Sequence, residues 1–354
     1  MQHRIPTAVG RSPVRGAVLA ALIAGAISSV GPGMARAEPQ GTVPASEASR
    51  IAADIRSLSR IGAGSAGEVG VAAWRLDGTG PGVLVNADDR FPMASTFKVA
   101  VAGAVLKRVD DGSVSLDQMI PITLDQMVDS EILQDRFIHP GVSLSVYNLL
   151  ELMLTQSDNT ATDYMLRVAG GPAAVNAWVR SQGVQALSVE GGTDEIIRRF
   201  AGISPAAGPF HAAIAAKFAA DPKAASQLDL PNPAFDNDLR DSASPRAMAR
   251  LLSRIFSGSA LSAKSTQILK DIMGRCRTGP LRLRGQMPPD SPVAHKTGTI
   301  GGTINDVGVI TLPGEAGQVV VAVFIKGSDA TAEQRELAIA QIGRSVRDYF
   351  LFRR

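Results

Sequence analysis

The two ends of the chain carry short apolar runs whose spacing differs from that of the middle. Near the start, residues 46–60 place apolar side chains at helical spacing and predict a helix. The runs 69–76 and 83–86 follow across a glycine-rich turn and predict a β-hairpin. The first part of the chain is therefore expected to give one helix and two strands.

The last part of the chain repeats these elements in the opposite order. Residues 307–312 and 319–325 are apolar runs on either side of a Pro-Gly turn and predict a second hairpin. Residues 332–350 then show apolar positions at helical spacing and predict a long helix. Each end of the chain thus supplies two strands and one helix.

Between these ends the apolar pattern is helical almost throughout. The predicted helices cover residues 99–106, 146–154, 161–168, 172–181 and 247–255. Strands from both ends with helices between them predict two lobes, a sheet lobe of about 46–90 and 290–354 and a helical lobe of about 91–289. A cleft between such lobes is where small ligands bind.

The first 37 residues have the composition of a secretory signal peptide. They hold four arginines and no acidic residue, an apolar run over 16–30, and Ala35-Arg36-Ala37 at the end. The apolar run is shorter than the roughly 20 residues that cross a bilayer, so cleavage after Ala37 is favoured over a permanent membrane anchor. We expect residues 1–37 to be a signal peptide, residues 38–354 to be the catalytic domain, and the protein to be periplasmic or secreted.

Charge and cysteine content narrow the classes of partner. Removing the four arginines of the signal changes the formal net charge from +3 to −1, so no nucleic-acid partner is implied. The single cysteine, Cys276, excludes an internal disulfide and is interpreted as a small core residue without a catalytic role.

His295 is interpreted as a strand residue, and His139 and His211 as structural or surface residues. One cysteine and four histidines without zinc spacing indicate no metal or cofactor, and a monomer is expected.

Three short strings carry the candidate chemistry, and the first is Ser95-Thr96-Phe97-Lys98. Three positions apart at the start of a helix, Ser95 and Lys98 face the same side, so the amine can reach the hydroxyl. Backbone amides at a helix start also favour an oxyanion. Because an ordinary lysine is almost fully charged at neutral pH, Lys98 can act as a base only if its pKa is lowered, and Lys296 is a second cation that could contribute.

The other two strings are Ser157-Asp158-Asn159 and Lys296-Thr297-Gly298. Each string alone has an ordinary explanation, such as a capping serine with a solvated lysine or a helix cap. Together they resemble the signature of class A β-lactamases and penicillin-binding proteins. Flanking residues 89–94, 160–163 and 278–306 extend the similarity to class A β-lactamases, which we place over about 46–350.

The resemblance implies a fold and a set of roles. The fold class is α/β (α+β), a serine β-lactamase/penicillin-binding-protein-like fold in which strands from both chain ends share one antiparallel sheet, flanked by helices, with an all-helical subdomain. In that family Ser157 would pass a proton to the leaving nitrogen and Asn159 would orient the substrate amide. The substrate-binding set on the edge strand would be Lys296, Thr297, Gly298 and Thr299, with the amides of Ser95 and Thr299 forming the oxyanion hole. Within this set, Lys296, Thr297 and Thr299 resemble the residues with which the family binds the substrate carboxylate. Arg282 resembles an arginine that some members use for the same carboxylate, a surface charge being the alternative.

One stretch departs from the family pattern. The loop that carries Glu-x-x-Leu-Asn in class A enzymes is replaced here by residues 189–197, and the segment 196–240 is inserted before the similarity resumes. We take Glu195 as the first candidate for the base that activates the deacylating water, with Glu190 and Asp194 behind it and a solvated acidic loop as the alternative. A positioned general base contributes about 10² to 10⁴ in rate, so efficient turnover depends on this loop.

The sequence therefore predicts a serine β-lactamase that hydrolyses the β-lactam amide through an acyl-enzyme on Ser95. Two alternatives use the same fold. One is a penicillin-binding DD-peptidase or serine esterase acting on a peptide such as that of peptidoglycan. The other is a non-turnover penicillin-binding module whose acyl-enzyme is released slowly.

Overall fold

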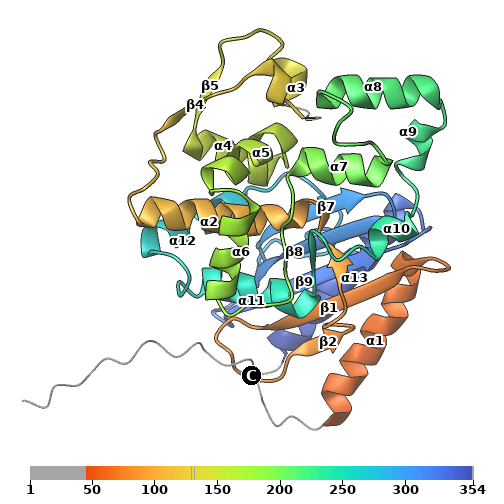
Figure 1. Cartoon of the computed structure of the whole chain (residues 1–354). Helices are drawn as coiled ribbons and strands as arrows, with labels where there is room; N and C mark the ends of the chain where they lie inside the picture. Colours follow the sequence, from red (N-terminus) through yellow and green to blue (C-terminus); the bar gives the residue numbers. More distant parts are fainter. Residues whose placement is uncertain (1–44, 129, 131, 353–354) are drawn as a thin grey trace, which may run out of the picture. The chain divides into compact units, whose positions relative to one another are not determined.

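A five-stranded antiparallel sheet takes its strands from both ends of the chain (Figure 1). In this computed structural model, residues 45–128, 130 and 132–352 are described, and the predicted signal peptide lies outside them. The strand order is β2-β1-β9-β8-β7. The strands are β1 (Glu68–Arg75), β2 (Val83–Val85), β7 (Val293–Ile300), β8 (Thr303–Thr311) and β9 (Gln318–Lys326). The sheet shared by both chain ends is confirmed, and the strand that carries Lys296 is at its edge.

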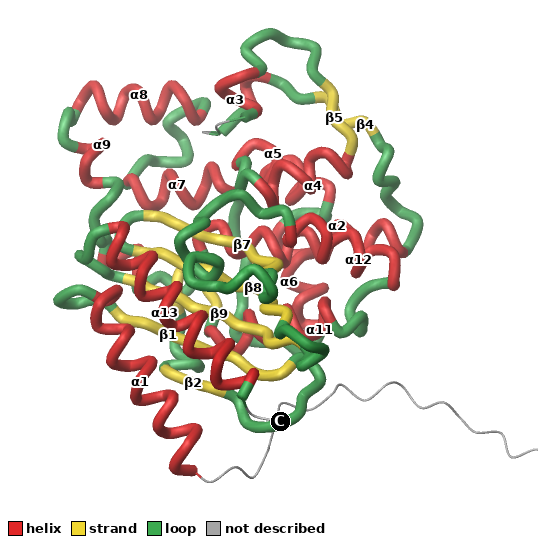
Figure 2. Tube along the Cα trace, turned by 180° about the vertical axis from the view of Figure 1, so that it is seen from behind, coloured by secondary structure: helices red, strands yellow, loops and turns green. Residues whose placement is uncertain are grey.

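Two terminal helices cover one face of this sheet, as Figure 2 shows from behind. They are α1 (Ala45–Ala63) and α13 (Ala332–Leu351). Helix α13 begins with a capping box between Thr331 and Gln334. The inner faces of both helices pack on one side of the sheet in a single apolar core, in which Ile55 and Ile339 are fully buried.

The helical lobe packs against the other face of the sheet and encloses a second core. Its main helices are α2 (Lys98–Asp110), α4 (Val146–Thr155), α5 (Asn159–Val168), α6 (Pro172–Ser181), α11 (Pro245–Phe256) and α12 (Ala263–Gly274). Helix α2 runs through the centre of this lobe (Figure 1), and every residue from Lys98 to Leu106 is buried. An apolar surface on all sides explains why this helix takes a central position. The start of α2 is therefore held rigidly.

Shorter elements lie outside the main sheet and the main helices. Two strand pairs lie outside the main sheet: β3 (Phe91–Pro92) with β6 (Ser242–Ala243), and β4 (Met119–Pro121) with β5 (Ser143–Ser145). Two short helical turns are η2 (Leu124–Gln126) and α3 (Leu133–Arg136). None of the described helices is both long and apolar enough to cross a membrane.

The inserted segment forms a helical cover at one side of the helical lobe (Figure 1). Its helices are α7 (Thr193–Ala201), α8 (Phe210–Ala220), α9 (Ala224–Gln227) and α10 (Pro233–Asp236). The carboxylate of Asp241 joins the two ends of this segment, because it accepts hydrogen bonds from the amides of Glu190 (2.7 Å) and Gly191 (3.1 Å) and from Arg199 (2.7 Å). The extra helix expected from the alanine-rich part of the insertion is α8.

Candidate active site

Ser95 lies in a turn of 3₁₀ helix, η1 (Ala94–Phe97), directly before α2. The residue before it, Ala94, has a φ of +43°, a conformation that non-glycine residues rarely adopt and that occurs at functional sites. A side chain at Gly298 of β7 would meet the carbonyl oxygen of Met93 at 2.6 Å and the amide nitrogen of Ser95 at 3.0 Å. Glycine at this position therefore lets the edge strand approach the Ser95 turn at backbone distance.

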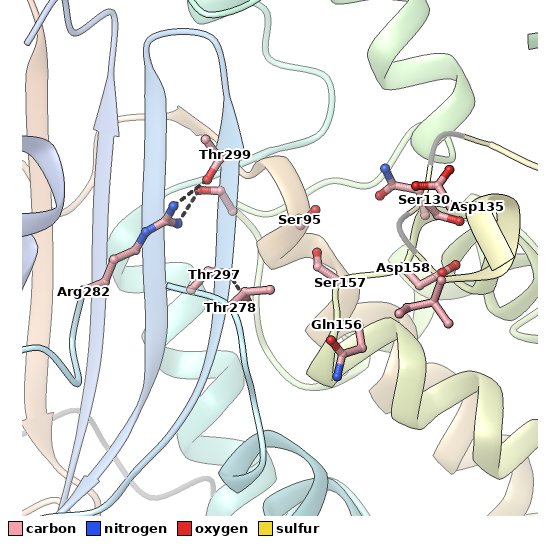
Figure 3. Close-up of a pocket in the computed structure, with 13 residues that line it drawn as sticks. Ser95, Ser130, Asp135, Gln156, Ser157, Asp158, Thr278, Arg282, Thr297 and Thr299 are labelled. Atoms are coloured by element: carbon pink, nitrogen blue, oxygen red, sulfur yellow. Dashed lines mark hydrogen bonds between the residues drawn. The ribbon is translucent and has the colours of Figure 1, made fainter. Parts of the chain in front are cut away.

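A polar cavity of about 310 Å³ opens between this turn, β7 and the start of α5 (Figure 3). The cavity is lined by most of the predicted site residues, namely Ser95, Ser157, Asn159, Arg282 and Thr297 to Thr299. Figure 3 shows the side chains of Ser95 and Ser157 facing the same space. Residues from three distant parts of the sequence thus meet in one cavity of the size that binds small molecules.

The ammonium group of Lys98 lies beneath this cavity, and its side chain is fully buried. Its Nζ donates hydrogen bonds to the carbonyl oxygen of Ser157 (2.7 Å), to Ser157 Oγ (3.2 Å) and to Asn159 Oδ1 (2.8 Å). Among the described residues, no hydrogen bond joins Nζ to the Ser95 hydroxyl. The direct contact that the three-residue spacing predicts is therefore not made here, and such contacts often tighten only when substrate binds.

The Ser157 hydroxyl lies between two buried lysines. Lys296 Nζ donates to Ser157 Oγ at 2.9 Å, so this oxygen accepts from both Lys98 and Lys296. Ser157 has a φ of +60°, and this backbone conformation places its side chain at the meeting point of the two amines. With its lone pairs engaged, the hydroxyl can direct its own proton into the cavity.

Both lysines have lowered pKa values. Burial is the main cause of the drop in the pKa of Lys98, the charge of Lys296 adds to it, and Asp158 and Asp163 oppose it. Burial also lowers the pKa of Lys296 to about 8. Lys98 therefore has the lowered pKa that the sequence analysis requires of it as a base.

The second string builds the end of the cavity as a helix cap. Asp158 caps α5 by accepting a hydrogen bond from the amide of Ala161 (2.8 Å), and its other oxygen accepts one from the amide of Leu133 (3.0 Å). This cap fixes Ser157 and Asn159 on either side of Asp158. The ordinary interpretation of this string as a helix cap is thus confirmed for Asp158, and the catalytic and substrate-binding roles of Ser157 and Asn159 stay predictions.

A family model described as the β-lactamase enzyme family matches residues 50–350 of the chain. The chain belongs to this family. It is 30% identical over 296 residues to the extended-spectrum β-lactamase PER-1 of Pseudomonas aeruginosa, which covers 81% of this chain and 84% of that protein. It is also 30% identical over 280 residues to the carbapenem-hydrolyzing β-lactamase KPC of Klebsiella oxytoca, with 78% and 82% covered.

Solved structures place this β-lactamase family member in class A. A W229D mutant of the class A β-lactamase of the last common ancestor of Gram-negative bacteria has a TM-score of 0.69 and 32% identity, covering 86% of this chain and all of that chain. A β-lactamase from Chitinophaga pinensis has a TM-score of 0.68 and 30% identity, covering 85% and 99%. The fold expected from the three strings is therefore confirmed.

Arg282 adopts a position in this β-lactamase family member that sequence reasoning left open. Its guanidinium donates to Thr299 Oγ1 (2.7 Å) and to the carbonyl oxygens of Gly298 and Asn305 (both 3.1 Å), and it pairs with Glu336 (3.1 Å). Figure 3 shows it pointing toward Thr299. Arg282 is 7% exposed, so the interpretation as a surface charge is wrong.

Glu195 is the predicted site residue that the structure does not bring to the cavity. Its carboxyl group lies against Gly191, where an added Cβ would be 2.2 Å from Oε2, and the residue is exposed. Burial, followed by the charges of Asp241 and Asp163, raises the pKa of Glu195. The acidic residues of this turn have a local role, since carboxylates stabilise the first turn of a helix such as α7. Glu190 and Asp194 do not line the cavity either.

Sequence reasoning missed several residues of the cavity. Ser130, Asp135, Gln156 and Thr278 also line it. The hydroxyl of Thr278 is 2.5 Å from that of Thr297, which places it beside the predicted carboxylate-binding set. Threonine in a loop carries little signal by itself, and only the fold brings Thr278 to β7. Within the described ranges, no cluster of His, Cys, Asp and Glu has the arrangement of a metal site.

Proposed function

We propose that this protein is a serine β-lactamase of the class A type, with Ser95 as the nucleophile. The observation that carries the proposal is the pair of buried amines that meet at Ser157 Oγ, beside a cavity lined by Ser95 and by residues of the other two sequence strings. The names of its relatives, which include extended-spectrum and carbapenem-hydrolyzing enzymes, support a β-lactam as the substrate.

In the acylation step, Ser95 Oγ attacks the lactam carbonyl and gives its proton to Lys98. The lowered pKa of Lys98 supports this role, because a neutral amine can accept a proton. The C–N bond of the ring then breaks, and Ser157 donates its proton to the leaving nitrogen. The proton that Lys98 took from Ser95 restores the Ser157 hydroxyl through the hydrogen bond from Lys98 Nζ to Ser157 Oγ, while Lys296 also donates to this oxygen. The amides of Ser95 and Thr299 stabilise the oxyanion. Gly298 of β7 lets the strand approach the Ser95 turn closely enough for both amides to do so.

The carboxylate of the substrate binds at the β7 side of the cavity. Thr297, Thr299 and the charge of Lys296 form this subsite, and Arg282 acts through its hydrogen bond to Thr299 Oγ1. Asn159 keeps the substrate amide in place from the opposite wall. Two positive side chains near one end of a small cavity favour an anionic ligand.

Release of the acyl-enzyme is the slower half-reaction in this proposal. Among the described residues, the carboxylates that line the cavity are Asp135 and Asp158, and Asp158 is engaged as a helix cap. The loop acids that sequence reasoning favoured lie outside. This observation also favours a second candidate function, a penicillin-binding protein that acylates readily and turns over slowly.

The remaining expectations about the protein follow from its family. We infer that it is exported to the periplasm or secreted, in agreement with the predicted signal peptide over 1–37. A role in resistance to β-lactam antibiotics follows from that location and from the proposed reaction. We infer a monomer, because one chain supplies every residue of the proposed site.

The proposal is tested by measuring the hydrolysis of benzylpenicillin by the exported protein, first in the pre-steady state and then in the steady state. A β-lactamase with slow release gives a burst of one equivalent of ring opening followed by continued turnover. A burst without turnover favours the penicillin-binding protein, and no ring opening at all contradicts both functions. Glu195→Gln is expected to change the slow phase by less than about twofold, because its carboxyl group is outside the cavity. A larger decrease in the rate of the slow phase would indicate that Glu195 acts as the base that activates the deacylating water.

A further inference from the structure

Behind β7 lie three buried ionisable groups that the proposed mechanism does not use: Cys276, His295 and Asp306. Cys276 follows the end of α12 and is 1% exposed, and the other two are fully buried on β7 and β8. Buried ionisable groups are costly unless they interact with one another. The three groups therefore need a common explanation.

The imidazole of His295 connects the cluster. Its Nδ1 is 2.8 Å and 2.9 Å from the two carboxylate oxygens of Asp306, and Asp306 also accepts from the amide of Leu283 at 3.1 Å. Cys276 is the second ionisable group that acts on the ring, because each of the two groups shifts the pKa of the other. Among the described residues, Nε2 has no hydrogen bond of standard geometry. A buried imidazole with a carboxylate on one nitrogen is suited to carry a positive charge.

The cluster also touches the wall of the cavity. The sulfur of Cys276 is 3.4 Å from Thr278 Oγ1, which in turn is 2.5 Å from Thr297 Oγ1. Figure 3 shows Thr278 and Thr297 joined in this way at the edge of the cavity. Lys296 lies between His295 and Thr297 in the chain. A change of charge on the sulfur is therefore felt at the proposed carboxylate subsite.

The pKa values of the cluster agree with this geometry. Although burial acts to raise it, the pKa of Cys276 is lowered to about 7, because His295 interacts with the sulfur. Although burial acts to lower it, the pKa of His295 is raised to about 9, with Asp306 as the main cause. Between these values the sulfur is a thiolate and the ring is an imidazolium.

We propose that Cys276, His295 and Asp306 form a thiolate–imidazolium–carboxylate cluster that keeps Lys296 protonated and orients the Thr278 and Thr297 hydroxyls for the substrate carboxylate. These are positioning residues, since none of the three lines the cavity. The inference rests on the proposed function for its effect on substrate, but the state of the cluster can be measured without substrate.

Lys296 meets charged groups from several elements. The positive groups near it are Lys98 of α2 and Arg282, both of which favour its neutral form. The negative groups that favour its charged form are the thiolate of Cys276 and the carboxylate of Asp306. Because Asp306 is already paired with His295, loss of the thiolate leaves Lys296 with two cations and one shared anion. The pKa of Lys296 should then fall further below its ordinary value.

Cys276 is the only cysteine in the chain, so ultraviolet absorbance of the thiolate reports this residue alone. We expect the native exported protein to titrate with a midpoint near 7, and His295→Asn to move the midpoint upward by at least about one unit, because the imidazolium is gone. If His295→Asn does not fold, Asp306→Asn gives the same direction through a less basic imidazole. A wild-type midpoint at or above that of an ordinary cysteine, or a midpoint that both variants leave unchanged, would overturn the cluster.

The second arm measures acylation and KM against pH with benzylpenicillin. Cys276→Ser keeps the size but not the acidity of the side chain, so the alkaline limb should move to lower pH by about half a unit or more, with KM rising several-fold and kcat nearly constant. Ser265→Ala, a buried change on α12 outside the cluster, is the control and should leave the profile in place. An unchanged profile in Cys276→Ser contradicts the positioning role. A wild-type protein that opens no lactam fails the proposed function instead, while the absorbance titration still decides whether the cluster exists.

Discussion

At the residue scale, the account depends on close approaches that no larger side chain permits. Gly298 faces the backbone of the Ser95 turn, and a methyl group there would meet the oxygen of Met93 at 2.6 Å. Backbone atoms at both sides of the contact cannot rotate away. The strand would have to move from the turn, and the two amides of the proposed oxyanion hole would separate.

Gly298→Ala is therefore expected to reduce the acylation rate constant for benzylpenicillin by at least about tenfold, equivalent to about 1.4 kcal/mol of transition-state stabilisation. Gly274→Ala is the matched control, because an added Cβ there meets no atom within 4 Å. Stopped-flow acylation of both variants gives the comparison. Equal rates would show that the approach of β7 to Ser95 is not needed.

The buried charge of Lys296 has a cost in stability that depends on pH. Its pKa is lowered from 10.5 to about 8, so the unfolded protein binds this proton more tightly than the folded protein does. By proton linkage, the contribution of Lys296 to stability is most unfavourable below about pH 8, and it becomes less unfavourable as the pH increases toward 10.5. The protein thus retains a destabilising residue in its active site.

Lys296→Met should raise the free energy of unfolding at neutral pH by up to about 3 kcal/mol, the value of its pKa shift, while hydrolysis is lost. The gain should vanish as the pH approaches 10.5, where the lysine is neutral in both states. Urea unfolding at a series of pH values measures the difference. A gain that does not change with pH would mean that packing, rather than charge, is its cause.

At the element scale, a side chain of α5 holds the start of α7 beside the proposed active site. Asp163 of α5 accepts hydrogen bonds from the amide and hydroxyl of Thr193 (both 2.6 Å) and from the amide of Asp194 (3.1 Å), which are the first residues of α7. The same carboxylate acts on the pKa of Lys98. Asp163 therefore links the orientation of α7 to the charge of the proposed base.

Asp163→Ala should leave three donors of α7 without this acceptor, at a cost of about 1 to 3 kcal/mol for the buried groups. We expect a lower unfolding temperature in calorimetry and a lower apparent pKa for the acylation base. Asp54→Ala, at an exposed position of α1, serves as the control. If Asp163→Ala matches the wild type in both measurements, the hydrogen bonds between Asp163 and α7 do not contribute to stability or to the pKa of the base.

Elements differed in how far the sequence could predict them. The strands at both chain ends and the buried helix after Ser95 follow from local apolar patterns, and the strings around Ser95, Ser157 and Lys296 identify the family. The loop beyond Val189 could not be predicted, because its shape depends on Asp163 and Asp241, which are distant in sequence from the atoms they hold. For the same reason the sequence could not show that Glu195 lies outside the cavity, whereas Cys276 is buried, as its interpretation as a core residue predicts.

At the scale of the whole molecule, the residues of the proposed reaction come from different elements of the two lobes. The turn η1 supplies Ser95, and the central helix α2 supplies Lys98. The residue before the cap of α5 is Ser157, and the edge strand β7 supplies Lys296. Because the helices and the sheet pack in two separate cores, these groups are held in place before substrate binds. The central claim is that this arrangement makes Ser95 a nucleophile.

Acid-quenched intact-mass measurement with benzylpenicillin, followed by peptide mapping, tests this claim most directly. The account predicts an adduct of one penicillin mass on the peptide that contains Ser95, which forms within the burst and decays as product appears. Ser95→Ala should form no adduct while it remains folded. An adduct on another residue, or an unchanged rate of ring opening in Ser95→Ala, would contradict the account.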